Sequence, residues 1–241
     1  MKNIQEYEKN LESLCRKLGR LKFSDPVHMV YNPLDYARKS HLSYMEQYFF
    51  NSPKKIIFLG MNPGPFGMAQ TGVPFGEISL VKNWMKVSEE VRQPKVVHPK
   101  RPIEGFECTR SEVSGRRLWG FFKDRFGSAN KFFKKHFVWN YCPLAFLSQT
   151  GANVTPDKIK AAEMLKLGKL CDEFLVEVIE SSSAHTLVGI GAYAEKALKR
   201  LFSENDYRVV KVLHPSPASP AANRGWAEAA SRQLEEASVL K

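Results

Sequence analysis

Three polar side chains follow short apolar runs of this chain, where buried strands are predicted to end. Asn62 follows the run 56–60, Asn140 lies in the run 137–141, and His214 follows the run 209–213. The carboxyl ends of parallel strands meet at one edge of an open sheet, so we expect these groups to converge. A lone Asn or His is more often a turn or structural residue. Three convergent polar groups instead favour a binding or catalytic site.

The loop after the first run is built for close contact with a ligand. Its glycines, which let a backbone approach a ligand closely, are Gly60, Gly64, Gly67 and Gly72. Its prolines, which keep the loop stiff, are Pro63, Pro65 and Pro74. The loop offers the amide of Asn62 but no carboxylate. Phe75 could stack on a flat ligand such as a base, or it could anchor the loop in the core.

The charge of the chain favours a polyanionic partner. Its 241 residues carry a formal net charge of +11 at pH 7. DNA, RNA or an acidic membrane would satisfy such a surface, although a basic protein without an anionic partner is the alternative. The basic run 97–102 and the pair Arg116-Arg117 are either solvated surface or part of a groove for a nucleic-acid backbone.

Several classes of protein are not expected. The four cysteines are scattered without a CxxC pair, which argues against a zinc knuckle, an iron–sulfur cluster or a disulfide framework. A Ser–His hydrolase built on Ser216 lacks the G-x-S-x-G elbow, and a zinc deaminase lacks H-x-E with P-C-x-x-C. The segment 189–194 lacks the third glycine of a dinucleotide fingerprint. We therefore expect no metal and no redox cofactor.

The remaining patterns predict one α/β domain over residues 1–241, with an N-terminal helical region of about 1–52. Strands are predicted over 56–60, 137–141, 186–191 and 209–213, and helices over 4–19, 40–50, 114–126, 155–179, 192–202 and 219–239. The segment 61–112 reads as a long functional loop with a helical turn near Trp84. Alternating strands and helices indicate a mostly parallel sheet. The N-terminus lacks a signal-peptide core, no apolar stretch could span a membrane, and reduced thiols fit an intracellular protein.

Four blocks of the chain resemble the single-strand-selective monofunctional uracil-DNA glycosylases, within the uracil-DNA glycosylase superfamily. They are residues 60–77, then 98–108 with Glu112-Val113-Ser114-Gly115 after it, then 139–144, and finally 214–217 followed by 222–226. Their order and context agree over most of residues 55–230. The resemblance implies a three-layer α/β/α fold with a short, mostly four-stranded parallel sheet.

The resemblance also implies roles for particular residues. Asn62 is similar to the residue that positions the attacking water, and Phe75 to the ring that stacks on a flipped uracil. Asn140 resembles the amide that reads the pyrimidine edge, and His214 the donor to O2 of the leaving base. The pocket wall is implied for Met61, Gly64 and Met68. Contact with DNA is implied for the wedge segment Ser216, Pro217, Ala218, Ser219 and Pro220, and for Arg224.

This chemistry needs stabilisation of a leaving anion. Breaking the N-glycosidic bond produces a sugar cation and a uracil anion, and one positioned donor is typically worth about 3–4 kcal/mol in such a transition state. Because the loop of Asn62 supplies no aspartate, we expect catalysis to depend on the leaving group and on DNA electrostatics. Turnover should be slower than in the superfamily branch with an aspartate in that loop.

The prediction is therefore a monomeric base excision repair glycosylase that flips its target base and leaves an abasic site. Its substrate would be uracil in single- and double-stranded DNA, together with bases such as 5-hydroxymethyluracil and xanthine. The small side chains of Ala218 and Ser219 put strong double-strand activity in doubt. The expected compartment is the bacterial cytoplasm or nucleoid, or the eukaryotic nucleus. The alternatives are a catalytically silent single-strand nucleic-acid-binding protein on the same fold and a nucleotide-binding Rossmann protein.

Overall fold

A parallel sheet of four strands lies at the centre of the protein, for which a computed structural model describes residues 1–240. The strands are β2 (Ile56–Gly60), β3 (His136–Asn140), β6 (Thr186–Ile190) and β7 (Arg208–Val212), in the order β3-β2-β6-β7. In the register of β2 with its neighbour β3, Gly60 lies opposite Asn140. The polar ends of β2 and β3 therefore reach the same edge of the sheet.

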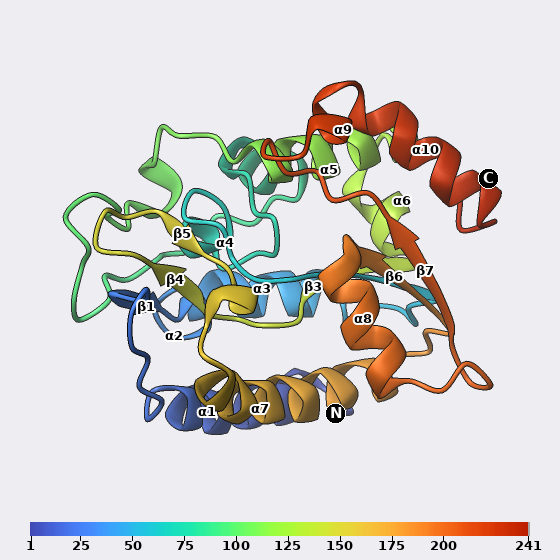
Figure 1. Ribbon diagram of the computed structural model, residues 1–241. Coiled ribbons are helices and arrows are strands. Elements are labelled where there is room, and N and C mark those ends of the chain that lie inside the picture. The colour runs from blue at the N-terminus through green and yellow to red at the C-terminus, as the bar shows by residue number, and fades with distance from the viewer. Residues whose placement is uncertain (241) are drawn as a thin grey trace.

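Helices cover both faces of this sheet, which gives three layers (Figure 1). The helices are α1 (Ile4–Leu18), α2 (Pro33–Tyr36), α3 (Arg38–Tyr48), α4 (Met68–Thr71), α5 (Val113–Phe126), α6 (Ala129–Phe133), α7 (Ala161–Glu180), α8 (Ala192–Leu201), α9 (Pro220–Asn223) and α10 (Trp226–Glu236). Phe58 of β2 packs edge-on against Phe122 of α5, with ring centroids 5.1 Å apart. On the other face, Phe137 of β3 stacks on Tyr44 of α3 at 4.9 Å. The predicted three-layer α/β/α fold is confirmed.

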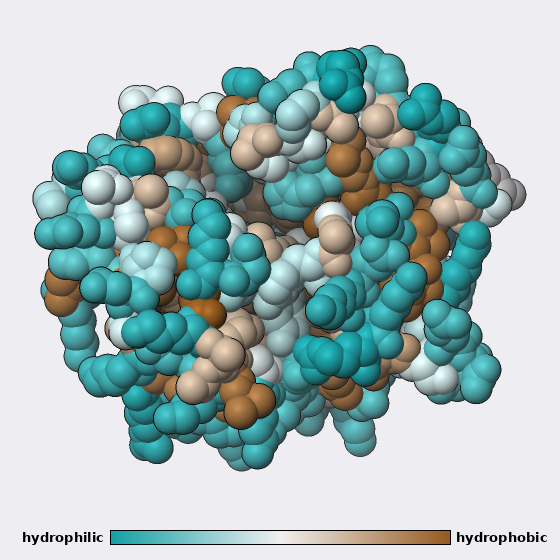
Figure 2. Space-filling model, in the orientation of Figure 1, coloured by the Kyte–Doolittle hydropathy of each residue, from teal (hydrophilic) through white to brown (hydrophobic). Residues whose placement is uncertain are grey.

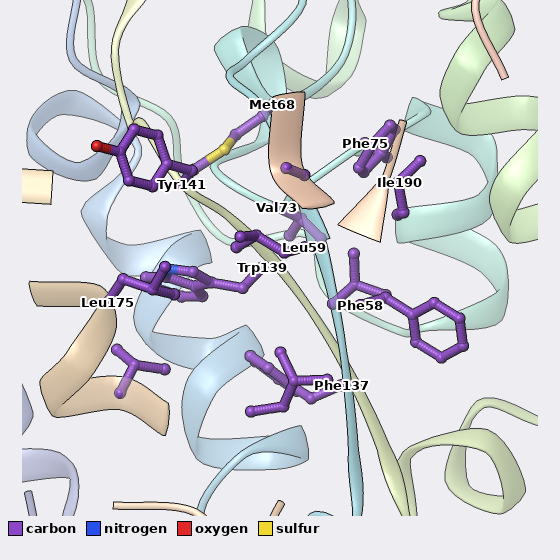
Figure 3. Close-up of a cluster of buried hydrophobic side chains, with 14 of the residues drawn as sticks. Phe58, Leu59, Met68, Val73, Phe75, Phe137, Trp139, Tyr141, Leu175 and Ile190 are labelled. Atoms are coloured by element: carbon purple, nitrogen blue, oxygen red, sulfur yellow. The ribbon is translucent and has the colours of Figure 1, made fainter. Parts of the chain in front are cut away.

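One hydrophobic core joins the sheet to both helical layers. Phe58, Leu59, Phe137 and Trp139 are almost fully buried in it, and Figure 3 shows them with other members of the cluster. Strands that are covered on both faces need apolar residues at successive positions, which explains the continuous runs in the sequence. Phe75 belongs to the same cluster, so the core also anchors the loop that follows β2.

A second, antiparallel sheet was not predicted. Its strands are β1 (Met29–Tyr31), β4 (Ala145–Leu147) and β5 (Asn153–Val154), in the order β1-β4-β5. Strands of two or three residues are too short to show the alternation that marks a strand in sequence. This sheet lies beside the long segment 61–112, within which the structure forms α4, a π-helical turn (Leu80–Trp84) and a 3-10 turn (Gly105–Glu107).

Two predicted helices are wrong in their extent. The helix predicted over 155–179 starts only at Ala161, because Pro156–Lys158 form a separate 3-10 turn. The helix predicted from 219 is broken after α9, where Gly225 adopts a φ of +123° that helical residues cannot have. Among residues 1–240, no helix is long and apolar enough to cross a membrane.

Candidate active site

A cavity of about 690 Å³ lies beyond the carboxyl ends of the parallel strands. Its walls come from the loop after β2, the segment before α5, the chain around β5 and the loop after β7. Figure 2 shows this face of the molecule hollowed, with mostly hydrophilic residues around the hollow. Asn62, Phe75 and His214, which the sequence singled out, all line it.

The amide of Asn62 has a defined orientation. Its Nδ2 donates to the carbonyl oxygens of Pro63, at 3.3 Å, and Leu144, at 3.4 Å. Since a carbonyl can only accept, these contacts place the NH₂ group against the backbone. The Oδ1 atom is then the part of the amide that can accept a hydrogen bond from a water molecule in the cavity.

Phe75 and Asn140 meet above the backbone of Gly60. A Cβ atom at Gly60 would lie 2.8 Å from Phe75 Cζ, and closer still to Phe75 Cε2 and Asn140 Oδ1. The absent side chain of Gly60 therefore provides the space in which the ring and the amide approach each other.

The side-chain carbonyl of Asn140 is buried and lacks a hydrogen-bond donor within residues 1–240. Asn140 is 4% exposed, and its Nδ2 donates to the sulfur of Met68 at 3.3 Å. Its Oδ1 has no hydrogen-bond partner within residues 1–240. Leaving a buried acceptor unpaired costs about 1–3 kcal/mol. An N–H group of a ligand could remove that cost.

The backbone holds Phe75 in an unusual conformation. Gly76 N donates to Val73 O at 2.9 Å, which closes a β-turn with Pro74 and Phe75 at its centre. Phe75 has a φ of +53°, at the position where this kind of turn usually carries glycine. Trp119 of α5 donates to Pro74 O at 3.1 Å and supports the turn. Strain of this kind persists where the surroundings fix it, and it concentrates at ligand sites.

His214 is a neutral imidazole whose tautomer is set by the backbone. Burial lowers its pKa to about 4. Ser216 N donates to His214 Nδ1 at 3.1 Å, so the proton of the neutral ring resides on Nε2. The ring lies 6.0 Å from that of Phe75, between centroids. His214 can therefore donate one hydrogen bond from Nε2 while it stays uncharged.

The predicted wedge segment forms a tight loop at the rim of the cavity. Ser219 N donates to Ser216 O at 3.0 Å, and Ser219 Oγ accepts from Ala222 N at the start of α9. The cavity is lined by Ser216, Pro217, Ala218 and Ser219. Pro220 is the first residue of α9, and Arg224 follows this helix on the surface.

Arg117 of α5 clamps this loop. Its guanidinium donates to Pro215 O at 3.1 Å, to Ser216 O at 3.3 Å and to Asn223 Oδ1 at 2.9 Å. The sequence predicted Arg117 either as a solvated surface residue or as part of a groove for a nucleic-acid backbone. The structure instead shows it tying α5 to the loop that carries His214.

Glu112 is a site residue that sequence reasoning missed. It lines the cavity just before α5, and its carboxyl group rests against the glycines of the loop after β2. A Cβ at Gly64 would lie 3.0 Å from Glu112 Cδ and would overlap Oε1, and one at Gly67 would overlap Oε2. Burial, with a smaller contribution from Glu77, raises the pKa of Glu112 to about 7. Its presence in the matched stretch 112–115 was the signal that could have found it.

The other predicted residues fall into two groups. Met61 and Gly64 line the cavity, whereas Met68 is buried, does not line it and contacts the Asn140 amide. Phe66 and Arg110 also line the cavity, and the guanidinium groups of Arg101 and Arg110 lie 5.2 and 4.2 Å from the ring centroid of Phe66. In the part of the chain that the structure describes, no three His, Cys, Asp or Glu side chains gather in a metal-binding arrangement.

Known proteins resemble this chain over almost its whole length. Residues 47–235 match the family model of the uracil DNA glycosylase superfamily. The single-strand selective monofunctional uracil-DNA glycosylase of Rattus norvegicus is 45% identical over 229 residues, which cover 94% of this chain and 82% of the rat protein. The Bos taurus protein of that name is 45% identical over 226 residues, with 93% and 83% covered.

A solved structure shows the same fold at much lower identity. The crystal structure of wild-type Pedobacter heparinus SMUG2 aligns with a TM-score of 0.65 and 16% identity, over 95% of this chain and 97% of the other. The chain belongs to the uracil-DNA glycosylase superfamily and, within it, to the single-strand-selective monofunctional uracil-DNA glycosylases. It is accordingly a DNA repair enzyme, a hydrolase that acts on N-glycosyl bonds.

Proposed function

We propose that this enzyme hydrolyses the N-glycosidic bond of a uracil flipped out of single-stranded DNA, and more slowly out of duplex DNA, and leaves an abasic site. The observation that carries the proposal is the meeting of Phe75 and Asn140 above Gly60. It offers a flat ring for stacking and an unpaired buried carbonyl for an N–H of the base. The net charge of +11 supplies attraction to the phosphate backbone.

Asn140 would read the edge of the base. Its Oδ1 can accept from N3–H of uracil, and its NH₂ can leave the weak acceptor sulfur of Met68 to donate to O4. Cytosine presents an acceptor at N3 and a donor at C4. An amide in the same orientation would face unmatched groups in cytosine, and unmatched buried polar groups are a strong basis for rejection.

Asn62 and His214 would act on the bond itself. Asn62 Oδ1 holds a water molecule for attack at C1′, since its NH₂ group is bound to the backbone. As the C1′–N1 bond breaks, its electron pair moves into the base, and His214 Nε2–H donates to O2 of the resulting anion. Such a donor contributes about 3–4 kcal/mol. A neutral imidazole supplies it without giving up its proton.

The range of bases and strands is part of the proposal. The space that Gly64 leaves is taken by Glu112, so room beside C5 for 5-hydroxymethyluracil would come from the flexible thioethers of Met61 and Met68. Xanthine, a larger purine base, would have to extend into the part of the cavity that uracil leaves empty. Because Ala218 and Ser219 are small, they fill the gap in a duplex poorly, which favours single strands.

Base release from an oligonucleotide with one central uracil tests the proposal. The strand is incubated with the enzyme, cleaved with alkali at abasic sites and resolved by length, in single-stranded and duplex form. We expect cleavage with uracil, none with thymine, and a loss of at least about 10²-fold in Asn62→Ala. Asn205→Ala, which changes an exposed asparagine before β7, is the matched control.

The outcomes separate the glycosylase from the silent binder. Cleavage that requires both uracil and Asn62 supports the proposed function. Tight binding of the single strand without release of uracil, 5-hydroxymethyluracil or xanthine would refute it and would favour a nucleic-acid-binding protein on this fold.

A further inference from the structure

The cavity contains a carboxyl group that the loop of Asn62 does not supply. Glu112 stands at the N-cap position of α5, yet its side chain makes no capping hydrogen bond within the described residues 1–240. It extends instead across Gly64 and Gly67, which leave space for it. Its Oε2 is buried and has no hydrogen-bond partner in residues 1–240.

This placement of the Glu112 carboxyl group disfavours folding and DNA binding, so a function in the reaction is the reason to look for. Burying an unpaired carboxylate disfavours folding, and a negative charge beside bound DNA repels the phosphates. A glutamine of the same shape would avoid both costs. The one positive charge that the proposed reaction creates in this cavity is that on the sugar, in the transition state, and a carboxylate would stabilise it.

We propose that Glu112 is a catalytic residue: its carboxylate accepts a proton from the water that Asn62 holds, and its charge opposes the positive charge that develops on the sugar. This inference rests on the proposed function. It also revises the expectation that catalysis depends on the leaving group and on DNA electrostatics, because a carboxylate comes from the residue before α5 rather than from the loop after β2.

The step balances without a co-reactant. The water oxygen forms the new bond to C1′, and one water proton passes to Glu112. The C1′–N1 electron pair leaves with uracil, whose anion accepts the hydrogen bond of His214. The proton on Glu112 then returns to uracil or to solvent, and the enzyme is restored.

The surroundings of Glu112 set its pH dependence. The loop segment 61–67 contributes no titratable side chain, and the chain after Phe75 contributes Glu77. His214 lines the same cavity as a neutral ring, and Arg110 lies at the rim over Phe66. With a pKa of about 7, the carboxylate forms as the pH rises through neutrality. Phosphates of bound DNA would move this transition to higher pH.

The test compares Glu112→Gln with Glu107→Gln, which changes an exposed glutamate of the neighbouring 3-10 turn. Single-turnover release of uracil is followed from about pH 5.5 to 9, together with binding to a strand that carries a stable abasic analogue. We expect wild-type excision to rise with pH through the Glu112 transition. Glu112→Gln should lose roughly 10²- to 10⁴-fold, the usual range for general-base catalysis, and lose this pH dependence. Its binding to the analogue should be unchanged or tighter.

Other outcomes overturn the role. Wild-type rate and pH profile in Glu112→Gln, or equal losses of rate, binding and thermal stability, would make Glu112 structural while the glycosylase function stands. If the variant does not fold, a wild-type rate that is flat across the pH range refutes the role by itself. A wild-type enzyme that releases no uracil would refute the proposed function, and the role of Glu112 with it.

Discussion

Gly60→Ala is the sharpest test of the pocket, since it adds a single methyl group at the meeting point of Phe75 and Asn140. Gly60 does not have a positive φ, so alanine can adopt its backbone conformation. The new Cβ would lie 2.8 Å from Phe75 Cζ, so the ring would have to retreat by at least about 0.6 Å to reach ordinary van der Waals contact. The closer atoms, Phe75 Cε2 and Asn140 Oδ1, require more.

The expected effect is large on activity and moderate on stability. A displacement of about 1 Å in a reacting group can cost about 10²-fold in rate. Overpacking a core costs about 1–3 kcal/mol, and the lower entropy of unfolded alanine offsets about 0.4–1 kcal/mol of that. For a chain of this size, each kcal/mol lowers Tm by about 2–4 °C. We therefore expect about 10²-fold slower uracil release, with a Tm lower by no more than about 10 °C.

Gly120→Ala provides the matched control. Gly120 lies within α5, and apart from its chain neighbours and the backbone of its own helix, a Cβ there would meet no atom of residues 1–240 within 4 Å. Replacing a helical glycine by alanine is worth about 1 kcal/mol, so this variant should have a higher Tm and wild-type excision. Single-turnover base release and thermal unfolding are measured on both variants. Wild-type excision by Gly60→Ala would refute the assignment of Phe75 and Asn140 to the base pocket.

Two further predictions follow from the support of the site. Arg117→Ala removes the hydrogen bonds that hold the loop of His214, so uracil release should fall about 10-fold or more, and further in duplex DNA than in single strands. The control, Arg116→Ala, should change the rates on duplex and single-stranded DNA by the same factor. Equal effects of Arg117→Ala and Arg116→Ala would contradict this. Burial lowers the pKa of His41 to about 4, so the unfolded chain binds a proton between about pH 6.5 and 4 that the folded chain does not. As the pH is lowered through this range, the free energy of unfolding measured by urea titration should fall by roughly 3 kcal/mol because of His41. His41→Gln should remove this part of the pH dependence. An unchanged dependence of the unfolding free energy on pH in His41→Gln would contradict the prediction.

The central sheet could be predicted to within a residue because β2, β3 and β6 are buried on both faces, and because the edge strand β7, although partly exposed, carries three valines. The run predicted over 56–60 is β2, and the run predicted over 209–213 is β7 (Arg208–Val212). The second sheet could not, since β5 has two residues and depends on its pairing with β4. Tertiary pairing, rather than local pattern, places Asn153 and Thr155 at the cavity.

The same difference separates the site residues that the sequence indicated from those it missed. Asn62 and His214 follow strands, so the topology of a parallel sheet was enough to bring them to one cavity. Glu112 stands at the N-cap position of α5 and Arg117 lies within it, so their positions depend on how this helix packs across the end of the sheet. No spacing in the sequence encodes that packing.

The glycines of the loop after β2 illustrate what only the structure adds. From sequence, Gly64 and Gly67 indicate a close approach of the backbone to a ligand. In the structure, the space that they leave is filled by the Glu112 carboxyl group, and the space at Gly60 by Phe75 and Asn140. The loop without a carboxylate is therefore shaped to receive one. A larger side chain at either Gly64 or Gly67 would exclude Glu112, so these glycines and the carboxyl group form one arrangement whose purpose the pH profile of excision can establish.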